Sequence, residues 1–108
     1  MTNTYHVEVE RKNRIENIVE KIGMGQIVKQ KYCRKAGAAK GSWLCISDTG
    51  ITTIKDDTGE LVITVYVTTS RELLFAYDGN AKKIPPYLRK RVARNESAYI
   101  REGKTIWQ

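Results

Sequence analysis

Residues 43–68 read WLCISDTGITTIKDDTGELVITVYVT, and this stretch decides the fold class. Three of its segments are rich in β-branched and aromatic residues, as strands are: Trp43–Ser47, Ile51–Lys55 and Glu60–Thr68. The breaks between them are DTG and DDTG, where Asp can bond its own downstream backbone and Gly accepts the positive φ of a tight reversal. The stretch therefore predicts an antiparallel meander of three strands.

The third segment suits a central strand by its length and composition, with one apolar side and one partly polar side. Side chains alternate along a strand, so Leu61 and Val65 point one way while Thr64 and Tyr66 point the other. We therefore expect a fourth strand, from residues 26–32 or from residues 5–9. Residues 26–32 also fit a second helical turn, and the sequence leaves both readings open.

Helical patterns flank the meander on both sides. Between residues 9 and 21 the apolar positions Ile15, Ile18, Val19 and Ile22 have the spacing i, i+3, i+4, i+7 of an amphipathic helix. After the meander, Thr69 and Glu72 match a capping box that begins a short helix to about Tyr77. Pro85 and Pro86 precede a cationic helix over residues 87–94. The expected architecture is α+β: an N-terminal amphipathic helix, a meander of three to four antiparallel strands, and C-terminal helices.

Length and composition restrict the broad class. The 108 residues suit one domain, and 41% apolar with 29% charged residues is ordinary for a chain that folds. Apolar runs fall far short of a membrane span of about 20 residues or a signal-peptide core of about 7 to 15. We therefore expect a cytoplasmic protein that does not enter membranes. Two cysteines, Cys33 and Cys45, and one histidine exclude a four-ligand zinc site and a disulfide framework, so we expect free thiols.

The net charge of +7 is unevenly distributed along the chain. Residues 1–41 carry nine basic and four acidic side chains, residues 42–80 two and six, and residues 81–108 eight and two. Two basic arms thus flank an acidic centre. Clustered cations create the positive potential that attracts polyanions, so we expect nucleic acid, RNA above all, as the partner. The expected contacts are the cations of a glycine-containing loop and of the helix near residue 90: Lys31, Arg34, Lys35, Lys40, Arg89, Lys90, Arg91 and Arg94.

Sequence motifs disfavour most enzyme classes. The chain has no GxxxxGK[ST], GxGxxG, HExxH or GxSxG motif, so we expect no cofactor and no metal. What remains is metal-independent cleavage of a phosphodiester, which needs a base, a cation and an acid. The candidates for these roles are His6, Thr64 and Tyr66, together with the basic loop. The plain alternative is that His6 is solvated and that Thr64 and Tyr66 are ordinary strand residues.

A resemblance supports the same chemistry. The order of a His-containing start, an amphipathic helix, a basic segment and the strands WLCISDTGITTIKDDTGELVITVY resembles the barnase-EndoU-colicin E5/D-RelE-like nuclease superfamily, above all its small phage and prophage members. The resemblance covers about residues 5–68. It implies RNA cleavage without a metal, with His6 as acid or base and Thr64, in a late T-x-Y strand, as a phosphate contact.

Two hypotheses from different classes follow. The first is a metal-independent endoribonuclease-like domain that binds RNA through the cations of its two basic arms. The second is a binding protein without turnover, of a phage-encoded, host-directed kind, whose basic surface occupies nucleic acid or an acidic face of a host protein. A homodimer that pairs the acidic centre of one copy with a basic arm of another is a further alternative.

Overall fold

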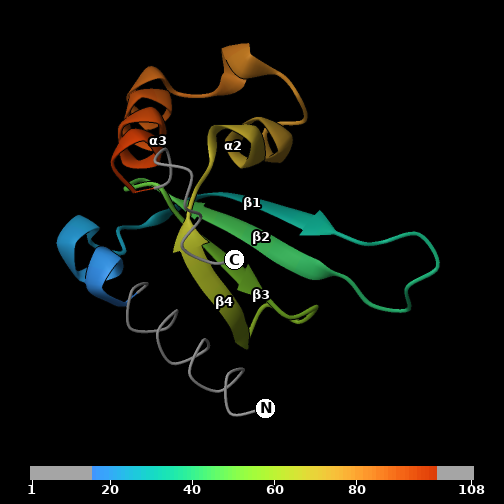
Figure 1. The fold of residues 1–108 in the computed structure, drawn as a ribbon. Coiled ribbons are helices and arrows are strands. Elements are labelled where there is room, and N and C mark those ends of the chain that lie inside the picture. Colours follow the sequence, from blue (N-terminus) through green and yellow to red (C-terminus); the bar gives the residue numbers. More distant parts are fainter. Residues whose placement is uncertain (1–15, 100–108) are drawn as a thin grey trace, which may run out of the picture.

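The computed structural model describes residues 16–99, which form a four-stranded sheet with helices on both faces (Figure 1). Residues 16–22 are helical. The remaining elements follow in chain order: β1 (Ile27–Cys33), β2 (Ser42–Ser47), β3 (Ile51–Lys55), β4 (Val62–Val67), α2 (Ser70–Ala76), a 3-10 helix η1 (Ala81–Lys83) and α3 (Pro86–Tyr99).

The sheet confirms the predicted antiparallel meander. Its strand order is β1-β2-β3-β4, and each strand pairs antiparallel with the next along the chain. The turns after Ser47 and Lys55 lie where the Asp and Gly residues indicated. The undecided residues 26–32 form most of β1, so the strand alternative is the right one.

The expected central position of the third predicted strand is wrong within the described sheet. The fourth strand, β1, pairs with β2 and not with β4, which leaves β4 with one neighbour among the described strands. The loop of residues 34–41 joins β1 to β2, and short turns join β2 to β3 and β3 to β4. Each connection therefore joins two neighbouring strands, and the strands lie in the sheet in the same order as in the chain. Residues 5–9, the other proposed partner, lie outside the described residues. Leu61, Val62 and Ile63 are consequently exposed.

The sequence pattern of the N-terminal helix falls partly outside the described residues. Of the predicted range 9–21, residues 16–21 belong to the helical segment 16–22, and residues 9–15 are not described. Ile18 of this segment is buried and packs with Ile51 and Val67 of the sheet. The two C-terminal helices, in contrast, confirm the prediction, with α3 extending beyond the expected residue 94 to Tyr99.

Strand pairing sorts the side chains onto two faces. Leu44 and Ile46 of β2 face α2 and α3, where they form the larger core with Leu73, Leu88 and Val92. The opposite face carries Ile51 and Val67 and is covered by the helical segment 16–22. Figure 1 shows α2 and α3 on one side of the sheet. No helix within residues 16–99 is long and apolar enough to span a bilayer.

The turn between β2 and β3 is fixed by contact with α3. Asn95 is buried and its Nδ2 donates to the carbonyl oxygen of Thr49 at 2.9 Å. Gly50 follows in a left-handed conformation, with φ of 87°, and a Cβ there would lie 2.6 Å from Asn95 Nδ2. Any side chain at Gly50 therefore disturbs both the backbone and a buried hydrogen bond.

We predict that Gly50→Ala lowers the free energy of unfolding by about 2–4 kcal/mol, from left-handed strain plus a lost buried hydrogen bond. Gly37→Ala is the matched control, because Gly37 has φ of 81° but no atom within 4 Å of the added Cβ. It should cost only about 1–2 kcal/mol. Urea denaturation of both variants measures the difference, and equal losses would show that the contact with Asn95 contributes nothing.

Candidate nucleic-acid interface

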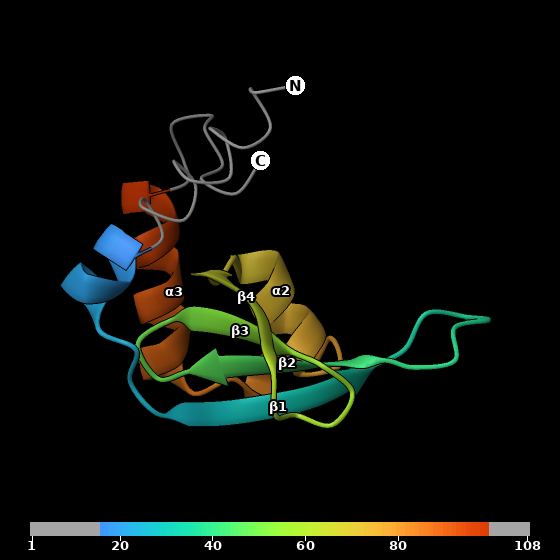
Figure 2. The same cartoon turned by 90° about the horizontal axis from the view of Figure 1, so that it is seen from below.

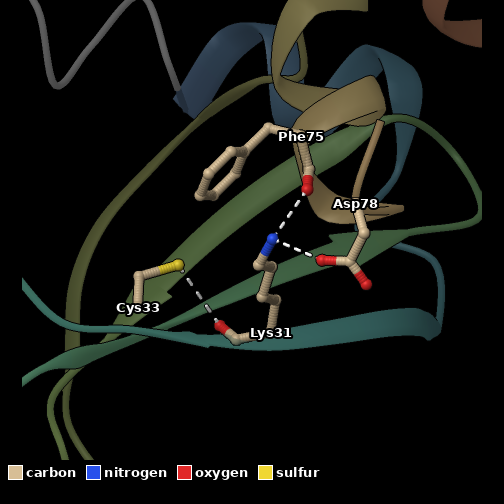
Figure 3. Close-up of polar contacts among 4 residues, drawn as sticks. All are labelled: Lys31, Cys33, Phe75 and Asp78. Carbon is tan, nitrogen blue, oxygen red and sulfur yellow. Dashed lines mark hydrogen bonds and ion pairs between the residues drawn. The ribbon is translucent and has the colours of Figure 1, made fainter. Parts of the chain in front are cut away.

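Lys31 is the centre of the candidate site. It lies on the edge strand β1, and strand pairing places its side chain on the face covered by α2. Its Nζ donates to the carbonyl oxygen of Phe75 at 3.0 Å and forms an ion pair with Asp78 Oδ1 at 2.6 Å (Figure 3). The same Nζ lies 4.0 Å from the centroid of the Phe75 ring, which is a cation–π distance. Strand β1 and the end of α2 are thus joined through one ammonium group.

An open hollow lies on the side of Lys31 that faces the β1–β2 loop, and we call it the hairpin hollow. It has a volume of about 490 Å³. The exposed ring of Phe75, a residue that is 50% exposed, contributes to its wall. The full lining is Lys31, Tyr32, Cys33, Arg34, Lys35, Ser42 and Phe75. Three cations and the exposed Phe75 ring therefore share one concave surface, whereas the Tyr32 ring lies on the opposite face of the sheet, edge-on to Trp43 at 5.2 Å.

A second hollow lies at the end of α2, and we call it the helix-end hollow. Its lining is Lys31, Arg71, Leu74, Phe75, Asp78 and Gly79. Lys31 and Phe75 belong to both hollows, so the two form adjoining parts of one surface. Arg71 adds a fourth cation, from the first turn of α2.

Asp78 is the only acidic residue that lines either hollow within the described part of the chain. The hydrogen bond and the charge of Lys31 lower the pKa of its carboxyl group, and the charges of Lys29 and Lys83 add to this effect. Asp78 is therefore ionised at neutral pH and cancels part of the positive charge of Lys31.

Tyr66, a predicted catalytic residue, belongs to a different cluster. Its hydroxyl donates to Oε2 of Glu72, and Thr52 Oγ1 hydrogen-bonds Oε1 of the same carboxylate at 2.7 Å. Thr68 extends the cluster through a 2.7 Å contact between its hydroxyl and that of Thr52. Both Thr side chains are fully buried. This cluster joins β3 and β4 to the first turn of α2.

The capping-box prediction is right in one half only. Glu72 N–H donates to Thr69 Oγ1 at 3.1 Å, so Thr69 caps α2 as expected. The Glu72 carboxylate, in contrast, accepts hydrogen bonds from Thr52 and Tyr66 on the sheet. Burial raises the pKa of Glu72, and these two hydrogen bonds oppose the rise. Burial and the neighbouring Glu72 raise the pKa of Tyr66.

The three predicted catalytic residues do not form a described active site. His6 lies outside the described residues, and Thr64 is exposed on β4. The Tyr66 hydroxyl donates a hydrogen bond to Glu72, and both carboxylate oxygens of Glu72 already accept hydrogen bonds. Cys33 lines the hairpin hollow, but burial raises the pKa of its thiol, which disfavours the nucleophilic thiolate. It is free, as is the buried Cys45.

The predicted cations separate into two groups. Lys31, Arg34 and Lys35 line the hairpin hollow, and Lys40 lies in the same β1–β2 loop. Arg89, Lys90, Arg91 and Arg94 lie on α3 and are exposed. Figures 1 and 2 both place this loop at one end of the sheet and α3 at the other. The expected contacts therefore lie at two ends of the molecule and do not form one shared surface around the loop.

Sequence reasoning missed four residues of these sites: Arg71, Glu72, Phe75 and Asp78. Each was assigned only to the short helix or to its end. The apolar run LLFA of residues 73–76 was an available signal, because four consecutive residues of a helix cannot all lie on one core-facing stripe. The structure buries Leu73 and Ala76 and leaves Phe75 exposed.

Within residues 16–99 no group of three or more His, Cys, Asp or Glu side chains could hold a metal ion. The chain matches no protein-family model, no curated protein and no solved structure. The site must therefore be interpreted from its own chemistry.

Glu72 gives a test through pH. A carboxyl group whose pKa is raised on folding stabilises the fold fully below its unfolded pKa and loses this contribution as pH rises through its folded pKa. Asp56 and Asp78 have lowered pKa values, so their contributions are lost only at more acid pH, below the ordinary Asp value. We predict that the wild type loses stability relative to Glu72→Gln as pH rises from about 4.5 to 7. Thermal unfolding of both proteins across this pH range measures the difference in stability. A difference that does not change with pH would contradict the prediction.

Proposed function

We propose that the protein binds single-stranded nucleic acid, with RNA favoured, through the hairpin and helix-end hollows. The observation that carries the proposal is that cations from two distant segments meet around the exposed Phe75 ring. Residues 31–35 and the side chains of Arg71 and Phe75 line adjoining hollows. Proteins that bind single strands combine a cationic groove for the backbone with aromatic side chains on which bases stack.

The chemistry assigns distinct roles to the two residue types. Lys31, Arg34, Lys35 and Arg71 would contact phosphates, which positions the strand without reading its sequence. The exposed ring of Phe75 stacks on a base of the bound strand, a contact worth about 1–3 kcal/mol. Duplexes fit this surface less well, since their bases are already stacked on one another.

Binding without turnover is the better supported of the two hypotheses. Phosphodiester cleavage requires an acid and a base that reach the bound phosphate. Tyr66 and Glu72 are bonded to each other in a partly buried cluster, and neither lines the hollows. Cleavage that uses His6 stays a prediction, as does binding by the cations of α3.

A matched pair of double charge reversals tests which surface binds. Lys35→Glu with Arg71→Glu alters the two hollows, whereas Lys90→Glu with Arg94→Glu alters α3 by the same net charge. We expect the first pair to weaken binding of a labelled 20-nucleotide RNA by about tenfold or more, because phosphate contacts become repulsions. The second pair should change it by less than about threefold. Fluorescence anisotropy measures both, and the reverse ranking would move the site to α3.

Salt dependence separates nucleic acid from a protein partner. If the strand contacts four phosphates, the log–log slope of affinity against salt should be near −3, at about −0.7 per contact on single strands. No measurable binding of RNA or DNA would overturn the proposal and favour an acidic protein surface as the partner.

Cleavage is tested directly by incubating the purified protein with labelled total RNA in EDTA. We expect intact RNA from the wild type and from His6→Ala alike, over a protein concentration range that saturates binding. Degradation by the wild type that disappears in His6→Ala would instead establish the nuclease hypothesis. Tyr66→Phe is the second variant, because it removes the hydroxyl while leaving the ring on β4.

A further inference from the structure

Asp78 ends α2 in an unusual way. The amide of Gly79 donates to Leu74 O at 2.9 Å and that of Asp78 to Phe75 O at 3.0 Å, which is the Schellman pattern of a helix C-terminus. The residue after the C-cap in this pattern takes the left-handed conformation and is usually Gly. Here it is Asp78, with φ of 56°, the only residue other than Gly with positive φ within residues 16–99.

Asp78 is doubly unfavourable for the helix that it ends. Asp adopts the left-handed conformation more readily than most residues, but still at an energetic cost relative to Gly. A carboxylate at a helix C-terminus also faces the negative end of the helix dipole, where cations are favoured. The following residue, Gly79, also has a positive φ, of 76°, so two consecutive residues at this turn are left-handed and only the second is glycine. A residue that violates local rules in this way is a candidate for a functional role.

The partner of Asp78 shows what that role could be. Its carboxylate oxygen lies 2.6 Å from Lys31 Nζ, the cation shared by both hollows (Figure 3). This is the geometry in which an ammonium group also binds a phosphate oxygen. The side chain of Asp78 is 76% exposed and that of Lys31 26% exposed, so solvent reaches the pair from the side of Asp78.

We propose that Asp78 is an intramolecular competitor of nucleic-acid phosphate: it occupies Lys31 in the free protein, and a phosphate of the bound strand replaces it. The inference rests on the proposed function, because it assigns one phosphate contact of that site. When Asp78 turns into water, Lys31 keeps its hydrogen bond to Phe75 O, so the ammonium stays in place for the phosphate. The ion pair therefore weakens non-specific capture of small anions and is given up to a strand that also stacks a base on Phe75.

The test is the affinity of Asp78→Asn for the same 20-nucleotide RNA. Asn tolerates the left-handed conformation, so the end of α2 is preserved while the competing charge is removed. The control is Glu60→Gln, which changes the net charge equally at an exposed position in the β3–β4 turn. We expect Asp78→Asn to bind about two- to fivefold tighter than the control, the range given by an exposed ion pair. Its salt slope should be steeper by up to about 0.7.

A double-mutant cycle with Lys31→Gln completes the test. In the Lys31→Gln background the effect of Asp78→Asn should fall to that of Glu60→Gln, because the competitor has lost its target. An Asp78→Asn effect equal to that of Glu60→Gln, or one that persists without Lys31, would overturn this inference while leaving the proposed function standing. Absence of binding by the wild type and every variant would instead overturn the proposed function. Circular dichroism melting of each variant verifies that the fold is intact.

Discussion

The candidate site depends on the packing of α2 against the sheet. Leu73, Ala76 and Tyr77 are buried against Leu44 and Ile46. Burial of one large apolar side chain is worth about 1.5–3 kcal/mol, whereas an exposed ion pair is worth about 0.2–1 kcal/mol. Packing therefore fixes where α2 ends, and the Lys31–Asp78 pair follows from that position. The pair is consequently weak enough to exchange with a ligand without moving the helix.

The polar cluster around Glu72 holds the opposite end of the same helix. Buried hydroxyls must find partners, and Thr52 and Thr68 find each other and then the Glu72 carboxylate. Ser70, the first residue of α2, also donates to Glu96 Oε1 of α3 at 2.6 Å. Because both ends of α2 are held, the helix presents the exposed Phe75 ring at a defined place above β1. Because the position of the ring is fixed before binding, less conformational entropy is lost when a base stacks on it.

The sequence predicted the elements that local residue patterns specify, and it missed the contacts between residues that are distant along the chain. Turn residues located β2, β3 and β4, and Thr69 located the start of α2. Strand β1 has the sequence IVKQKYC, in which apolar and polar residues do not alternate, so no pattern distinguished it from a helical turn. Lys31 was identified as a cation of the site, but its partners Phe75 and Asp78 lie 44 and 47 residues away along the chain. The capping box explained Glu72 so well locally that its contact with the sheet was not expected.

The net charge of the chain says less about the candidate site than the charges close to Lys31 do. At physiological ionic strength the screening length is about 8 Å, so cations at the far end of the molecule hardly act on a strand in the hairpin hollow. The +7 of the chain is therefore a poor measure of the field at Lys31. What matters there are the cations that line the hollows with it, Arg34, Lys35 and Arg71, together with Lys29 and Lys83 near Asp78, and the one carboxylate of Asp78. A single acidic residue changes this small local sum far more than it changes the total, which is why its position at the centre of the site is informative.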